Sequence, residues 1–183
     1  MEPMNEGHLL GALASGDRAA AEKLVDETYR QVFASLVRLT GGDADAAADL
    51  TQETYRKAWK SLPKFQRRSQ LSTWLYRIAY NTFLNSIRRP VRLQPIDEAY
   101  AATVEDPEPD QEELLRRREV AARLRRAVIG LPEPFRYTVT ARFWGGISVE
   151  EIARQEQVTG AAIRKRLKTA KRRLRDALGE NAL

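Results

Sequence analysis

Residues 148–172 read SVEEIARQEQVTGAAIRKRLKTAKR, and this stretch decides how the carboxy-terminal part of the chain folds. It opens on Ser148-Val-Glu-Glu151, a capping box in which the serine and the glutamate satisfy free amides at a helix start. Apolar residues follow at the spacing of two helices that cross over a short turn: Ile152, Ala153, Val158, Ile163 and Leu167. The pattern predicts a helix-turn-helix with Val158 filling the turn.

The second helix of this pair separates apolar from basic residues. Ile163, Leu167 and Leu174 are predicted to point inward, and the outward side carries Arg164, Lys165, Lys168, Lys171 and Arg172. Gly160 and Ala161 at its start let the backbone approach a duplex closely, and a positive helix end favours phosphate. Both features are typical of a DNA recognition helix.

Two positions fit this motif badly. Glu156 stands where an apolar residue would pack, and Gln157 stands where a glycine would ease the turn. For this segment alone, a basic amphipathic helix that closes a small bundle or lies on an anionic membrane remains an alternative.

Apolar residues upstream also recur at helical intervals, and no stretch alternates as a strand would. Helices are predicted up to Gly41-Gly42, up to Pro63 and up to Pro90. We therefore expect an all-α protein of two small helical bundles, the second containing the helix-turn-helix. The expected bounds are 1–90 for the first domain, 91–112 for a linker and 113–183 for the second domain.

Charge is distributed in blocks along the chain. Residues 56–92 hold ten basic residues and no acid, and residues 161–175 hold eight basic residues and no acid. Between them, residues 97–113 hold eight acids and no base and are interrupted by Pro107 and Pro109. This arrangement predicts two modules that each meet a polyanion, joined by a flexible acidic linker.

Composition excludes several classes of protein. The 183 residues carry a net charge of +6 and contain no cysteine and a single histidine, His8. A thiolate zinc site, a disulfide framework, a thiol nucleophile or a histidine-based triad cannot be assembled within this chain. We therefore expect no enzyme activity, no metal and no cofactor. Without an apolar run of roughly 18 residues or a signal peptide, a cytoplasmic protein without membrane insertion is expected.

The first basic block contains aromatic residues as well. The loop from Lys64 to Gln70 follows Pro63, is polar and basic, and is therefore not expected in the core. A basic loop beside aromatic side chains suits single-stranded nucleic acid, because bases stack on the rings and phosphates follow the charge. Trp74 is expected to pack in the core, and Asn81 either reads a base edge or lies on a solvated face.

Three segments resemble the ECF group of bacterial sigma factors. The stretches Asp49–Trp59 and Ser72–Asn81, with Phe65 and Arg88-Arg89, resemble region 2 of that group, and Leu131–Leu178 resembles region 4. The resemblance covers most of the chain, in the order that the group has. Glu156 and Gln157 depart from the apolar-glycine pair usual at the turn, and Ala161 and Ala162 leave few hydrogen-bonding side chains there.

The resemblance implies a sigma factor that directs promoter recognition, DNA melting and transcription initiation, with core RNA polymerase, promoter DNA and an anti-sigma factor as partners. Contact with the polymerase would be made by Asp49, Gln52 and Glu53. The promoter element nearest the start site would be held by Lys64, Phe65, Arg67, Arg68, Arg77, Asn81, Arg88 and Arg89. The distal element would be held by Arg164, Lys165, Arg166, Lys168, Lys171 and Arg172.

Other interpretations stay open at this point. Asp49 and Glu53 are spaced i, i+4 and form a solvated acidic face in the simplest structural interpretation. The whole chain also fits an autonomous helix-turn-helix regulator that binds duplex DNA without polymerase, or, less well, a protein-interaction adaptor with no DNA role.

Overall fold

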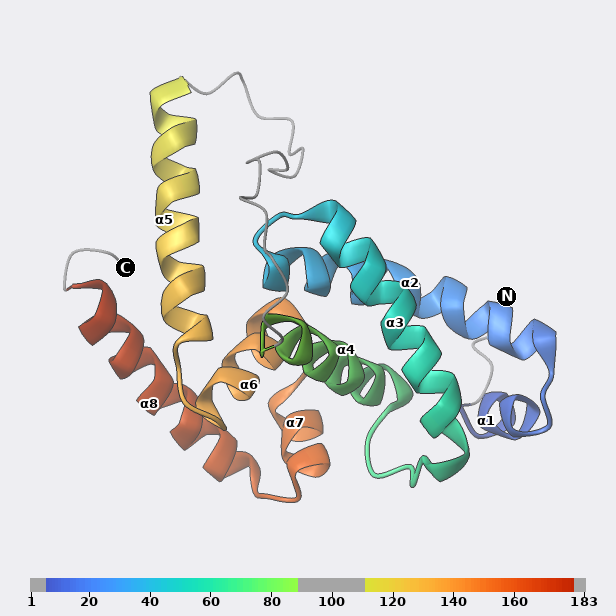
Figure 1. The fold of residues 1–183 in the computed structure, drawn as a ribbon. Helices are drawn as coiled ribbons and strands as arrows, with labels where there is room; N and C mark the ends of the chain where they lie inside the picture. The colour runs from blue at the N-terminus through green and yellow to red at the C-terminus, as the bar shows by residue number, and fades with distance from the viewer. Residues whose placement is uncertain (1–5, 89–110, 180–183) are drawn as a thin grey trace.

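A computed structural model of the chain describes residues 6–88 and 111–179. Every regular element in these two ranges is helical, which confirms the prediction of an all-α fold. Figure 1 shows two groups of helices that meet along α4. Arg89 and most of the predicted linker lie outside the described residues.

The N-terminal group consists of α1 (Glu6–Ala14), α2 (Arg18–Thr40), α3 (Ala44–Ser61), the short 3₁₀ helix η1 (Leu62–Lys64) and α4 (Leu71–Arg88). The helices α2, α3 and α4 pack against one another. Fully buried side chains from all three fill the space between them, among them Leu24, Leu36, Ala58, Leu75 and Phe83. This packing presents one side of α3 and one side of α4 outward.

Local sequence signals set the ends of α2 and α3. The Asp17 carboxylate accepts a hydrogen bond from the Ala19 amide at 2.8 Å, and the Asp43 carboxylate caps α3 in the same way at Ala46. Between the two helices, Gly41 adopts a left-handed conformation with φ of 84°, which a glycine enters without steric cost. The predicted stop at Gly41-Gly42 is thus confirmed.

The C-terminal group consists of α5 (Gln111–Ile129), α6 (Phe135–Val139), the π-helical turn η2 (Thr140–Trp144), α7 (Val149–Glu156) and α8 (Gly160–Leu178). A small core of Val128, Leu131, Val139, Ala170 and Leu174 holds α5, α6 and α8 together. The helix α8 also packs on α7, its neighbour in the predicted helix-turn-helix.

Some apolar positions do not lie where periodicity predicted. The spacing of Phe135, Val139 and Phe143 predicts one buried helical stripe, but Phe143 is 67% exposed, because the π-helical turn widens the helix and shifts the register of its side chains. Tyr29 and Ile87 continue the helical spacings Val25-Tyr29-Val32 and Phe83-Ile87 but are exposed. Trp74 is half-buried and packs against the core, as expected.

The two helical groups share one hydrophobic core, which the sequence did not predict. Tyr76 and Tyr80 of α4 pack in the same buried cluster as Tyr137 of α6 and Ile152 of α7. In Figure 1, α4 lies between the other N-terminal helices and the α6–α7 part of the C-terminal group. No helix within 6–88 or 111–179 is long and apolar enough to cross a membrane.

Candidate nucleic-acid interface

The turn between α7 and α8 is held by local hydrogen bonds. The Ser148 hydroxyl accepts a hydrogen bond from the Glu151 amide at 3.1 Å, as the capping box predicted. Thr159, which the sequence analysis missed, caps α8 by accepting from the Ala162 amide at 3.2 Å. Gln157 has a φ of 56°, so the position where a glycine would ease the turn is indeed left-handed.

The helix α8 separates its side chains as the periodicity predicted. Ile163 and Leu174 are buried, and Leu167 is half-buried against the core. The exposed side carries Arg164, Lys165, Lys168, Lys171 and Arg172. Arg164 forms an ion pair with Glu150 of α7 at 3.1 Å, in which both side chains are more than half exposed. An ion pair that exposed is weak, so it leaves Arg164 available to a ligand.

Arg166 differs from the other basic residues of α8. Its side chain is 22% exposed and forms an ion pair at 3.3 Å with Glu156, the residue that fitted the motif badly. The same carboxylate forms an ion pair with Arg77 of α4. Glu156 therefore joins two predicted DNA-contacting arginines instead of packing as an apolar residue would.

The loop after η1 presents its basic residues to solvent. Lys64, Arg67 and Arg68 are exposed, and Arg67 adopts a positive φ of 54°. Phe65 is half-buried, with its ring centroid 5.0 Å from that of Trp74. Since Phe65 rests on Trp74, the loop offers one partly covered aromatic ring rather than a freely exposed one.

Along α4 the predicted promoter-contacting residues lie in different environments. Asn81 and Arg88 are exposed. Arg77 is turned toward the C-terminal group, where its guanidinium lies 3.6 Å from the centroid of the Tyr137 ring. Arg77 thus does not lie free beside the Lys64–Gln70 loop.

The predicted polymerase-contacting residues share the outer side of α3. Asp49 and Gln52 are exposed, and Glu53 forms ion pairs with Arg56 at 2.6 Å and Lys57 at 3.4 Å. Hydrogen bonding from Arg56 holds the pKa of Glu53 well below its ordinary value of 4.5, at about 2. Glu53 also lines an open groove of about 730 Å³ between α3 and α4, which Arg88 lines from the other side.

Within 6–88 and 111–179, no three His, Cys, Asp or Glu side chains gather as metal ligands. What the two ranges contain instead is an exposed basic helix, a basic loop and a mixed-charge helix face.

Comparisons with known proteins assign the chain to a family. The sequence profile of Sigma-70 region 2 matches residues 24–92. The ECF RNA polymerase sigma factor SigM of Mycobacterium tuberculosis is 30% identical over 175 residues, which cover 96% of this chain and 85% of the relative. The chain belongs to the ECF RNA polymerase sigma factors. This membership agrees with the expectation that the protein is not an enzyme.

Other relatives of this sigma factor match a shorter part of the chain, and the solved structures share its fold at low sequence identity. The ECF RNA polymerase sigma factor RpoE of Cereibacter sphaeroides is 31% identical over 108 residues, or 59% of this chain and 58% of the relative. The chain thus spans little more than half the length of that relative. Among solved structures, CnrH in complex with the cytosolic domain of CnrY has a TM-score of 0.62 at 21% identity, covering 94% of this chain and 96% of that one. That similarity shows the fold.

Proposed function

We propose that this sigma factor binds core RNA polymerase and directs promoter recognition, DNA melting and transcription initiation, and performs no chemistry itself. The observation that carries the proposal is the exposed basic side of α8, set over the buried face of a helix-turn-helix. Such a helix fits the major groove, where arginine reads guanine edges and lysines neutralise phosphates. In this assignment Arg164, Lys165 and Lys168 read bases, and Arg166, Lys171 and Arg172 hold phosphates.

The first domain, residues 1–90, is proposed to serve both the polymerase and the proximal promoter element. Asp49, Gln52 and Glu53 on the outer side of α3 form the docking surface for the polymerase. The exposed basic loop and α4 meet the melted strand, with Asn81 at a flipped base and Arg77, Arg88 and Arg89 on phosphates. An acidic linker, residues 91–112, joins this domain to the distal-element domain, residues 113–183.

Polymerase is needed because strand capture is costly. Unstacking and flipping a base requires a few kcal/mol, which two small modules contacting two short elements offset poorly. Docking on core polymerase fixes both modules at the promoter spacing and raises their effective concentration. The isolated protein should therefore bind promoter duplex weakly and with steep salt dependence.

The test is a gel-shift titration of one promoter fragment at fixed salt, with and without core polymerase. A sigma factor binds tightly and opens the DNA only with core, and the mixture then starts transcription. An autonomous regulator, the alternative function, binds the duplex tightly and specifically alone, and core polymerase changes nothing. The second outcome would overturn the proposal.

Two further assignments follow from the family. We propose that the protein works in the cytoplasm, where polymerase and promoters are. We also propose that an anti-sigma factor holds it, since solved relatives of the same fold are complexes of this kind, such as RpoE with the anti-sigma factor NepR from Bartonella quintana. Co-purification of the chain with a partner that blocks its binding to core polymerase would test the second assignment.

A further inference from the structure

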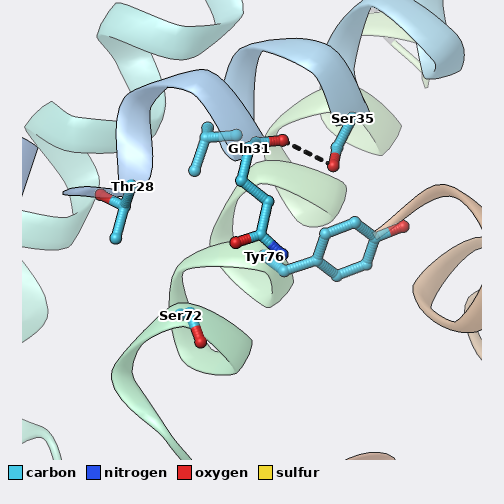
Figure 2. Close-up of a pocket in the computed structure, with 6 residues that line it drawn as sticks. Thr28, Gln31, Ser35, Ser72 and Tyr76 are labelled. Carbon is cyan, nitrogen blue, oxygen red and sulfur yellow. Dashed lines mark hydrogen bonds between the residues drawn. The ribbon is translucent and has the colours of Figure 1, made fainter. Parts of the chain in front are cut away.

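The cavity shown in Figure 2 belongs to the packing between α2 and α4. Gln31, Ser35 and Tyr76 are among the residues that line it, and its volume of about 10 Å³ is close to that of one water molecule. An organic ligand does not fit there. Selective recognition is therefore expected at the surface instead, and on α8 the proposed function assigns it first of all to Arg164.

Arg164 occupies a particular position on α8. It is the first side chain of the helix that can donate a hydrogen bond, because the preceding residues are Gly160, Ala161, Ala162 and Ile163. Long side chains on a helix point back over the preceding turn, toward the helix N-terminus. In a helix-turn-helix, that end of the second helix meets the base edges. The Arg164 guanidinium is therefore well placed to read a base.

The first helix of the motif supplies a partner for this guanidinium. Nη2 of Arg164 donates a hydrogen bond at 3.1 Å to the carboxylate of Glu150, in the first turn of α7. A guanidinium carries several N–H donors in a planar fork, and a bidentate contact with guanine occupies only one edge of it. The second hydrogen on Nη2 and those on Nη1 thus remain for a base while the contact with Glu150 is kept.

Gly160 leaves the space in which the guanidinium lies. A Cβ atom at this position would lie 3.3 Å from Nη1 of Arg164 and 3.8 Å from its Cζ, so an alanine would displace the guanidinium by a few tenths of an ångström. Gly160 is the first residue of α8 and does not have the left-handed backbone that calls for a glycine. What the glycine provides here is therefore room beside Arg164.

Two elements thus confine the same side chain, α7 through Glu150 and the start of α8 through Gly160. We propose that Glu150 and Gly160 are positioning residues for Arg164, and that Glu150 thereby determines specificity at the distal base pair that Arg164 reads. This inference rests on the proposed function for the assignment of Arg164 to base reading.

Confinement matters because a free arginine has a choice of partners. An unrestrained Arg164 can turn to a phosphate, which carries no sequence information, as readily as to a base edge. In the free protein the ion pair with Glu150 is exposed and weak, but DNA that covers it excludes water and strengthens the hydrogen bond. The carboxylate also repels phosphates on every sequence. Glu150 therefore lowers overall affinity while it raises the difference in affinity between sequences, and that difference is specificity.

Glu150 has a simpler role that needs no DNA. An acidic residue in the first turn stabilises the start of a helix, and Glu150 lies in the first turn of α7. That role predicts a change in the free energy of unfolding, but no change in which base pair is preferred. Base preference is therefore the quantity that separates the two roles.

The experiment uses the full chain and a pool of short DNA duplexes with a randomised centre. Duplexes bound at low salt are sequenced, which gives the preference at each base pair, and anisotropy gives the affinity for the unselected pool. Glu150→Gln should lower the preference at one base pair about fivefold, part of the roughly tenfold loss expected there for Arg164→Ala. Affinity for the unselected pool should rise, because a negative charge near the phosphates is removed.

Asp176→Asn is the matched control for charge. It removes the same charge from an exposed position about 18 Å farther along α8. It should leave the preference at every base pair unchanged. The double variant of Glu150→Gln with Arg164→Ala should show the same preferences as Arg164→Ala alone, since a positioning residue has no effect once its target is gone.

Gly160→Ala tests the space beside the guanidinium without changing any charge. It should lower the preference at the same base pair, while the free energy of unfolding stays equal or rises slightly, because alanine favours a helix more than glycine does. Urea unfolding measures this and verifies that every variant folds. If the new methyl group merely hinders the approach of the DNA backbone, affinity falls equally for all sequences and also in the Arg164→Ala background, and Gly160 then has no positioning role.

The proposal is overturned if Glu150→Gln and Asp176→Asn give the same preferences, if Glu150→Gln still changes them in the Arg164→Ala background, or if the wild-type chain selects no base pair at all. Transcription with core polymerase is measured in parallel from a promoter that carries the selected sequence. If Glu150→Gln relaxes the preference but no transcription starts even with the wild-type chain, the proposed function fails and the positioning role stands.

Discussion

The two basic helices α4 and α8 come from sequence blocks of similar charge, but their basic side chains differ in how far they are exposed to solvent. On α8, Arg164 meets a carboxylate in an exposed pair, and its neighbours extend into solvent. On α4, Arg77 meets a carboxylate that is largely buried between the helical groups and lies against an aromatic ring. A basic block therefore predicts a polyanion surface only where no other element of the fold covers it.

In the proposed function both α4 and α8 contact DNA and neither contacts the polymerase, so the largest effect on transcription is expected at α3, the proposed docking helix. Asp49→Arg should abolish transcription with core polymerase, because it reverses the charge at the centre of the proposed docking surface. Duplex binding by α8 should not change, since α3 contributes nothing to it. Transcription assays and duplex anisotropy on the same preparation measure both quantities.

Asp45→Arg is the control for that variant. It lies exposed one turn earlier on the same helix and introduces the same charge, outside the predicted docking residues. Equal loss of transcription in both variants would show a general charge effect and would remove Asp49 from the docking surface.

The contact between α4 and the C-terminal group depends on buried aromatic packing, which a stability measurement can test. Tyr137 is 1% exposed and packs on Tyr80 with ring centroids 5.1 Å apart. Tyr137→Ala should lower the free energy of unfolding by about 3 kcal/mol or more. Phe143→Ala, which removes an aromatic ring that is 67% exposed in the adjoining turn, should change it by less than about 0.5 kcal/mol. Urea denaturation compares them, and equal losses would contradict the burial of Tyr137.

The exposed helix α8 allows a finer test, which distinguishes a residue that reads bases from a residue that holds a phosphate. Arg164→Ala should cost about 1–3 kcal/mol of duplex binding and relax preference at one or two distal base pairs, through loss of a bidentate contact to guanine. Arg172→Ala should weaken all sequences evenly and lower the salt slope by about one phosphate contact. A panel of duplexes titrated at several salt concentrations separates the two. Two equal, sequence-independent losses would mean that Arg164 does not read bases.

Much of this fold could be predicted because its signals are local. The caps at Ser148 and Gly41 and the apolar stripe of α8 all depend on neighbours within a few residues, and the structure has each of them. The all-helical class follows from the same periodicity.

The contact between the helical groups could not be predicted, because it joins residues far apart in the chain. Gln31 and Gly145 are 114 positions apart, and nothing in either local sequence indicates the other. The one available signal was the misfit at Glu156, whose carboxylate in an apolar position required a partner that the motif did not supply. The π-helical turn that exposes Phe143 likewise has no signature in periodicity.

The smallest expected effect is a shift in the pKa of Glu53. Its ion pairs lie on the surface of α3, whereas the ion pair of Arg77 is largely buried. The Glu53 pKa of about 2 lies below the ordinary 4.5 chiefly because Arg56 donates hydrogen bonds to it. A lowered folded-state pKa means that the pair favours the folded protein above about pH 4.5 and loses this contribution as the pH falls toward 2. Carboxyl NMR should follow that titration, and Arg56→Gln should move the midpoint up toward 4.5.

Lys57→Gln should move it less, since Lys57 lies farther from the carboxylate, and 1 M salt should also raise it because an exposed pair is screened. A midpoint that neither variant nor salt changes would mean that the ion pairs do not set the charge of Glu53.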